Sequence, residues 1–146
     1  MQPRLNPMEA APDAMRAMRA LEDHVKNCGL EPTLMNLVKM RASQINGCVF
    51  CLDMHSRDAR ARGETEQRLY LLDAWREAMV YSDRERAALA WTEALTRIAE
   101  THAPEDTYSA LRAQFSEAEI VNLTLLIATI NGWNRLAIGF RSPHRT

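Results

Sequence analysis

The sequence predicts an all-α fold: a helical bundle of about six to seven helices in a single domain over residues 1–146. Apolar residues recur at spacings of three and four along most of the chain, and no segment shows the period-two alternation of a half-buried strand. Prolines and glycines stand where such helices would begin and end. The length suffices for one core, and the chain is 47% hydrophobic and 25% charged, as is usual for globular domains.

Four helices are predicted in the first half of the chain. Prolines open the first two, at residues 12–29 and 32–47, and both end at a glycine. The third runs from about residue 48 to 63 and also ends at a glycine, which favours a helix C-terminus. The fourth is expected over residues 66–80, where leucines and a tryptophan form the apolar set.

Three more helices are predicted in the second half. Ser82 with Glu85 and Ser116 with Glu119 are capping-box pairs, which open helices that end near residues 100 and 140. A shorter helix is expected between them, over residues 104–114. The last helix is apolar on nearly every side, so it should be central in the bundle or covered by a neighbouring subunit. Its asparagines should then hydrogen-bond to one another or to backbone groups across an interface.

Charge and hydropathy exclude two classes of partner. The net charge is −1, and the 18 basic residues are scattered among 19 acidic ones, so neither nucleic acid nor an anionic membrane is an expected partner. No apolar signal core is visible near the N-terminus, and the longest uncharged run, residues 120–134, is too short to span a bilayer. We therefore expect a cytoplasmic protein, in which a Cys-x-x-Cys pair binds metal or is redox-active.

The segment QINGCVFCLDMH holds such a pair, with a histidine four residues further on. On a helix, Cys48, Cys51 and His55 fall within a stripe about 60° wide, whereas Phe50 is expected to point away. Both sulfurs would lie in the first helical turn, where backbone N–H groups favour a thiolate. His55 lies one turn from Cys51 and can accept its proton, and the cysteine spacing permits a disulfide.

Other interpretations of this cluster are weaker. A structural zinc site wants four ligands, and here three share one helix; the further cysteine, Cys28, lies 20 residues before Cys48. Covalent haem attachment needs a histidine directly after the second cysteine, where this chain has Leu52. Two small buried cysteines beside a hydrogen-bonded histidine remain an alternative. We predict no metal and no bound cofactor.

Charged neighbours of the motif have two interpretations each. Asp58 can orient the ring of His55, or the two can form an ordinary exposed polar pair. Lys39, Arg41 and Arg57 can hold the charge near the thiols positive, or they can pair with aspartates on the surface.

Residues 36–96, within a motif core at 34–96, resemble the carboxymuconolactone decarboxylase superfamily, and within it the alkylhydroperoxidase D-like (AhpD-like) branch. The run LVKMRASQINGCVFCLDMH makes the resemblance far more specific than Cys-x-x-Cys alone. The resemblance implies a helical homo-oligomer, a trimer or hexamer, with thiol-dependent peroxidase activity on hydroperoxides. It also implies an external thiol or dithiol reductant, or a lipoyl-type protein, in place of a bound cofactor.

The same resemblance implies residue roles. Cys51 would attack the peroxide and become a sulfenic acid, Cys48 would condense with it to a disulfide, and His55 would belong to the proton relay. Members of the family also have a glutamate twelve residues before the first cysteine and a histidine directly before the second. This chain has Asn36 and Phe50 there. Asn36 can orient a water or His55, but an amide cannot relay a proton as a carboxylate does.

Two further functions compete with a peroxidase. The chain could be a non-enzymatic helical oligomer whose cysteines sense redox state or close a structural disulfide. It could also be a decarboxylase-like lyase for a small lactone, with incidental cysteines.

Overall fold

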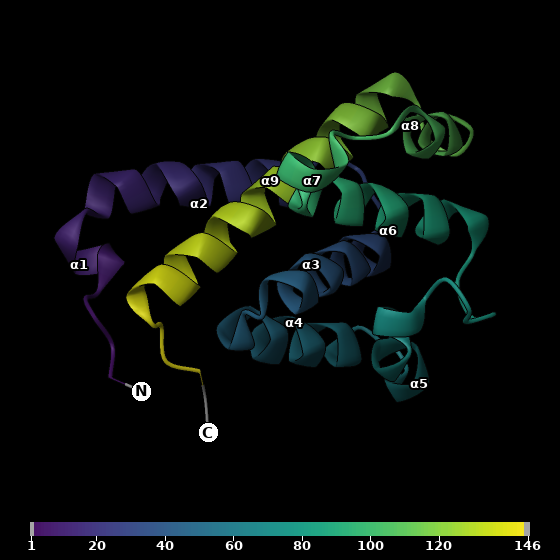
Figure 1. The fold of residues 1–146 in the computed structure, drawn as a ribbon. Helices are drawn as coiled ribbons and strands as arrows, with labels where there is room; N and C mark the ends of the chain where they lie inside the picture. Colours follow the sequence, from purple (N-terminus) through teal and green to yellow (C-terminus); the bar gives the residue numbers. More distant parts are fainter. Residues whose placement is uncertain (1, 145–146) are drawn as a thin grey trace.

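The computed structural model describes residues 2–144, and within them it holds nine α-helices, one 3₁₀ helix and no strand. The α-helices are α1 (Pro7–Ala10), α2 (Pro12–Lys26), α3 (Pro32–Asn46), α4 (Val49–Ala61), α5 (Glu66–Tyr70), α6 (Asp83–Thr96), α7 (Ile98–Thr101), α8 (Glu105–Arg112) and α9 (Glu117–Phe140), and the 3₁₀ helix η1 spans Leu72–Ala74 (Figure 1). The predicted all-α fold is confirmed. The helices outnumber the predicted six to seven because α1 and α7 are single turns, which leave little periodic signal.

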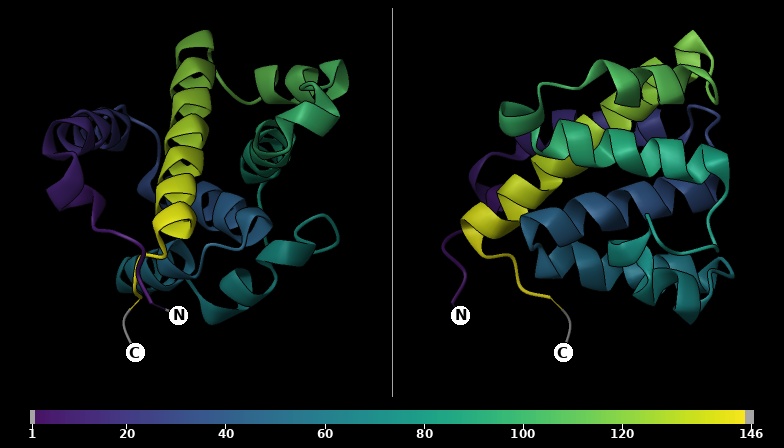
Figure 2. Two further views of the ribbon diagram at one scale, coloured as in Figure 1. Left: turned by 60° about the vertical axis from the view of Figure 1, so that its left-hand side comes forward. Right: turned by 45° about the vertical axis from the view of Figure 1, so that its right-hand side comes forward.

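Helix α3 is the central element of the bundle. It packs against α4, α6 and α9, and buries nearly every residue between 34 and 43 (Figure 1). For the last helix the sequence predicted either a central place or cover by a neighbouring subunit. Helix α9 lies between α2 and α6 (Figure 2) and also packs against α3, α4 and α8. It leaves Val121 and Ile138 exposed, so burial within one chain explains only part of its apolar surface.

The turn between α3 and α4 positions the cysteine motif. Gly47 has φ 67° and ψ 35°, a left-handed conformation that glycine adopts without strain and that ends α3. Cys48 follows in extended conformation as the N-cap of α4. The chain therefore reverses in two residues, and α3 and α4 pack side by side over their lengths. Both predicted capping boxes, at Ser82 and Ser116, are also present.

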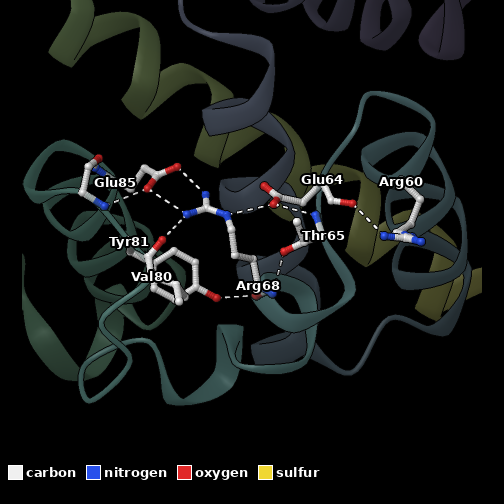
Figure 3. Close-up of polar contacts among 8 residues, drawn as sticks. Arg60, Glu64, Thr65, Arg68, Val80, Tyr81 and Glu85 are labelled. Atoms are coloured by element: carbon white, nitrogen blue, oxygen red, sulfur yellow. Dashed lines mark hydrogen bonds and ion pairs between the residues drawn. The ribbon is translucent and has the colours of Figure 1, made fainter.

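The helix predicted over residues 66–80 is wrong beyond Tyr70. After α5 and the short η1, the chain continues as turns and loop to Ser82. Arg68 explains part of the break, because its guanidinium donates to the carbonyl of Val80 and to the carboxylates of Glu64 and Glu85, 2.8 and 2.5 Å away (Figure 3). The Tyr81 hydroxyl donates to the Arg68 carbonyl, which closes the loop.

A second arginine binds the carbonyls within this loop. Arg86, on α6, donates to the carbonyl oxygens of Trp75, Arg76 and Ala78 at 2.9, 2.6 and 3.0 Å. Backbone carbonyls that a continued helix would satisfy internally are thus satisfied by side chains from another helix. Apolar periodicity cannot reveal this, because the competing partner comes from tertiary structure.

The two ends of the described chain lie side by side (Figure 1). The backbone N–H of Arg4 donates to the carbonyl of Phe140 at 3.0 Å, and its guanidinium donates to the carbonyl of Gly139. Across residues 2–144, no helix combines the length and the hydropathy that crossing a membrane requires.

Candidate active site

A cavity of about 520 Å³ lies among α2, α3, α4 and α9. Its volume is in the range of small-molecule sites. Its apolar wall includes methionines from α2, α3 and α4, and its polar side chains include Glu22, Asn36, Lys39, Cys51, His55 and Asp58. The structure therefore brings Asn36, Cys51, His55 and Asp58, all of them predicted site residues, to the wall of one cavity.

The two cysteines of the motif differ in their access to this cavity. Both are free thiols, and each is only 1% exposed. Cys51, in the first turn of α4, lines the cavity, whereas Cys48 does not. The Cys51 thiol donates a hydrogen bond to Cys48, so the two sulfurs are neighbours, with Cys51 between the cavity and Cys48.

Their acidities also differ. The pKa of Cys48 is lowered to about 6, chiefly because the Cys51 thiol donates to it, with help from the backbone amides of Cys51 and Phe50 at the start of α4. The pKa of Cys51 is raised, because it is the donor in this pair and because it is buried. The sequence predicted that the start of this helix would favour a thiolate, and in the structure the cysteine whose pKa is lowered there is Cys48. Near neutral pH the pair shares one proton and bears one negative charge.

An amide cluster from α3 and α9 supports the sulfurs. Asn134 is fully buried, donates to the Ser43 hydroxyl at 3.0 Å, and hydrogen-bonds to both cysteines, which lowers the pKa of each. Asn46 donates to the side-chain oxygens of Asn131 and Asn134, both at 2.9 Å. The asparagines of α9 bond to Asn46 of α3 and not to one another, so that part of the prediction is wrong, whereas Asn131 does donate to a backbone carbonyl, that of Ile127 at 2.9 Å within the same chain. The contact of Asn134 with the two thiols was not predicted. A polar side chain on a helix that is otherwise apolar could have indicated it.

His55 lies on the wall of the cavity, one turn after Cys51. The ring is buried, and burial lowers the pKa of His55 to about 4, with a further contribution from the positive charge of Lys39. The imidazole is therefore neutral near pH 7 and can accept a proton. Asp58 is exposed at the cavity, and its charge raises the pKa of His55 without a hydrogen bond to it.

The two positions that depart from the family pattern both face this cavity. The amide nitrogen of Asn36 is buried, and no residue between 2 and 144 accepts a hydrogen bond from it. The expectation that Phe50 points away is wrong, because its ring lines the cavity and packs beside both cysteines. Helical angles describe where a side chain leaves the backbone, and a ring of this size reaches around the neighbouring residue.

Two cavity residues were not identified from the sequence, and a third was left ambiguous. Glu22 of α2 accepts hydrogen bonds from the Lys39 ammonium and from the Trp133 indole, the latter at 3.1 Å. Neither Glu22 nor Trp133 was predicted as a site residue. Of the three cations near the motif, only Lys39 lines the cavity. The other two pair with acidic residues: Arg41 with Glu93 and Asp73, and Arg57 with Asp53.

A metal is not suggested by the side chains present. In residues 2–144 no three His, Cys, Asp or Glu side chains are grouped as ligands for an ion. Cys28, the possible fourth zinc ligand, is half-buried against the core at the end of α2 and is not part of the cavity wall.

Comparisons with known proteins agree with this architecture. Residues 12–94 match the model of the carboxymuconolactone decarboxylase family. The uncharacterized protein YdfG of Bacillus subtilis (strain 168) is 44% identical over 138 residues, 94% of each chain. YnjA of Escherichia coli (strain K12), also uncharacterized, is 31% identical over 73% of this chain and 58% of its own length.

Solved structures are similar over nearly the whole chain. The crystal structure of ATU0492 from Agrobacterium tumefaciens, a protein of unknown function for which an AhpD-type antioxidant defence role is suggested, has a TM-score of 0.97 and 50% identity over 99% of both chains. The debrominase Bmp8 shares the fold alone, with a TM-score of 0.85 and 21% identity over 95% of this chain and 75% of Bmp8. The chain thus belongs to the carboxymuconolactone decarboxylase family and, within it, to the AhpD-like branch.

Proposed function

We propose that this protein is a thiol-dependent peroxidase that reduces hydroperoxides through a disulfide cycle between Cys51 and Cys48. One observation supports this function above all. Cys51 and His55 line one cavity, while Cys48 does not line it and lies in hydrogen-bonding contact with Cys51, so the two sulfurs can form a disulfide.

The first step oxidises Cys51. Its sulfur, as thiolate, attacks the terminal oxygen of the hydroperoxide, the O–O bond breaks, and the products are a sulfenic acid on Cys51 and an alkoxide. His55, which is neutral because its pKa is near 4, accepts the Cys51 proton and returns it to the alkoxide, which leaves as the alcohol.

The second step forms the disulfide. The Cys48 thiolate, which the backbone amides at the start of α4 and the Asn134 side chain favour, attacks the sulfur of the sulfenic acid, and the oxygen leaves as water once protonated. An external dithiol, free or on a lipoyl-type protein, then supplies two electrons and two protons and restores both thiols. The protein would need no bound cofactor for this cycle.

The assembly of the protein is part of the proposal. Val49, Met79 and Val121 are 53, 97 and 66% exposed, and α9 has more apolar surface than one chain covers. We expect a homo-oligomer, a trimer or hexamer, in which such surfaces are buried.

Peroxide consumption with a dithiol reductant tests the function. Cys51→Ser should abolish it, because serine cannot supply a thiolate, whereas Cys28→Ser is the matched control and should retain it, because Cys28 lies outside the cavity. Full activity in Cys51→Ser would contradict the proposal. An inactive wild-type protein whose disulfide still opens and closes reversibly would favour the redox-sensing alternative.

The fold is also found in a debrominase, which suggests a second assay. Bmp8 has been solved in complex with 2,3,4-tribromopyrrole. The cavity of the present chain has aromatic and methionine walls of a kind that suits a small aromatic ring. Bromide release from a bromopyrrole, with no consumption of hydroperoxide, would favour reductive dehalogenation by the same dithiol.

A further inference from the structure

Lys39 is an unusual residue for the centre of a helical bundle. It is 8% exposed, lies on α3, and reaches the cavity wall. The chain has one other lysine, Lys26, which is exposed near the end of α2. Burying an ammonium group is costly unless nearby groups compensate its charge, so the surroundings of Lys39 indicate what the charge does there.

The cation is held in place by the two helices on the far side of the cavity. Glu22 of α2 accepts from the Lys39 ammonium through one carboxylate oxygen and from the Trp133 indole of α9 through the other. Both carboxylate oxygens of Glu22 therefore accept a hydrogen bond, and the bond from Trp133 fixes the carboxylate that binds Lys39. One carboxylate compensates the ammonium charge, and the positive end remains at the cavity.

Helix geometry places Lys39 opposite the reactive residues. Helices α3 and α4 run side by side from the turn at Gly47, with Lys39 eight residues before the turn and His55 eight residues after it. The two residues are therefore at the same level along the helices, and Cys51 lies only one turn, about 5.4 Å, nearer the turn. In agreement with this position, the charge of Lys39 lowers the pKa of both Cys51 and His55.

Lys39 lines the cavity on the side from which a peroxide would reach the cysteine pair. The pair bears one negative charge, and the start of α4 stabilises that charge on Cys48, the sulfur that does not line the cavity. A peroxide in the cavity meets Cys51. Lys39 lines the same cavity, and its positive charge lowers the pKa of Cys51, which favours the thiolate form of that sulfur.

We infer that Lys39 is a positioning residue that stabilises negative charge on Cys51, the sulfur that lines the cavity, and that Glu22 and Trp133 hold Lys39 in that position. The consequence for peroxide attack depends on the proposed peroxidase function, but the distribution of charge between the sulfurs does not. A thiol that loses an opposite charge at this range is expected to gain about one pKa unit.

The test measures the pH dependence of Cys51 alkylation by iodoacetamide in a Cys48→Ser protein, followed by mass spectrometry of the peptide that contains Cys51. Adding Lys39→Met should raise the midpoint by about one unit. Lys39→Arg, which keeps the charge, should restore most of the shift. Arg16→Met removes a positive charge from an exposed position of α2 that does not line the cavity, and it is the matched control, with an unchanged midpoint expected.

The direction of the shift separates charge from packing. A merely structural role for Lys39 would loosen the site, expose Cys51 and lower its pKa, because burial is one cause of the raised value. An unchanged or lower midpoint in Lys39→Met therefore overturns the inference. If Lys39→Met does not fold, Lys39→Gln gives the same comparison, because its amide is neutral and can still donate to Glu22.

A second readout uses the protein with both cysteines intact. With less than one equivalent of iodoacetamide, Lys39→Met should shift the label from Cys51 toward Cys48 by several-fold, and an unchanged ratio contradicts the inference. Neither alkylation experiment involves a peroxide. A wild-type protein that fails to consume hydroperoxide would therefore refute the proposed function without affecting the alkylation result. An unchanged alkylation midpoint in Lys39→Met would likewise refute the role of Lys39 without affecting the proposed function.

Discussion

Two polar clusters of this protein, both partly buried, differ in how completely their groups are paired. Around Arg68, two carboxylates and a backbone carbonyl accept from one guanidinium, and the Tyr81 hydroxyl donates to the Arg68 carbonyl (Figure 3). In the thiol cavity, the amide nitrogen of Asn36 has no partner within residues 2–144, and burial and nearby charges set the pKa of His55 without a hydrogen bond.

The contrast separates a structural cluster from a reactive one. A fully paired network fixes the loop that follows α5 and leaves no group free to react. Buried polar groups without partners cost stability, and they persist where they serve a ligand or a reaction. The thiol cavity keeps an unpaired amide, a neutral imidazole and one proton shared by two sulfurs. Each of the following variants changes either the cluster around Arg68 or the thiol cavity.

The largest effect is expected for Cys48→Ser, on the reactive side. Without a resolving thiol, turnover with a dithiol should fall by at least about a thousandfold, since the attacking and resolving groups act as a unit. The first oxidation should still occur, so a sulfenic acid on Cys51 should react with a dimedone-type probe. A variant that turns over normally, or that never yields the adduct, would argue against the assigned roles.

Breaking the paired cluster should instead cost stability. Arg68→Met leaves Glu64 and Glu85 without their cation and the Val80 carbonyl without a donor, so the free energy of unfolding should drop by about 3 kcal/mol. Urea denaturation measures this. Arg16→Met, which removes an exposed ion pair with Asp13, should change stability by less than about 0.5 kcal/mol and serves as the control. Folded Arg68→Met should keep the wild-type alkylation midpoint at Cys51.

His55 should make stability depend on pH. Its pKa is about 4 in the folded protein and about 6.5 when exposed, so the unfolded chain binds more protons between these values. Stability should therefore fall as the pH drops from 6.5 to 4, by about 3 kcal/mol from this residue. His55→Gln should flatten that part of the profile in denaturation at a series of pH values. An equally steep profile in His55→Gln would assign the effect to other groups.

Two asparagines allow a finer comparison. Asn36→Leu removes an amide whose nitrogen has no partner among residues 2–144, so stability should change by less than about 1 kcal/mol. Asn134→Leu deprives Ser43 and Asn46 of partners and should cost about 2 kcal/mol. It should also raise the pKa of Cys48, because the hydrogen bond from Asn134 lowers it. Equal losses in the two variants would remove the distinction between paired and unpaired amides.

Local signals in the sequence predicted much of the fold. Prolines, glycines and two capping boxes gave the start or end of α2, α3, α4, α6 and α9 to within a few residues, because caps act within one turn. The segment after Tyr70 was predicted wrongly, because Arg68 and Arg86 satisfy its carbonyls from a distance. The central place of α3 was not predicted, because it depends on how the helices pack against one another.

The candidate site divides in the same way. Cys48, Cys51 and His55 lie within eight residues, so their spacing alone brought them together. Glu22 and Asn134 reach the site from α2 and α9, and their role depends on how helices pack, which spacing cannot encode. The order of the two cysteine acidities likewise depends on burial and on Asn134 and Lys39.

Mass spectrometry of the protein before and after one equivalent of an organic hydroperoxide tests the central claim most directly. Disulfide formation between Cys48 and Cys51 should lower the mass of the peptide that contains both by about two mass units, with one equivalent of alcohol released, and a dithiol should reverse the change. An unchanged peptide with the hydroperoxide intact would contradict the account.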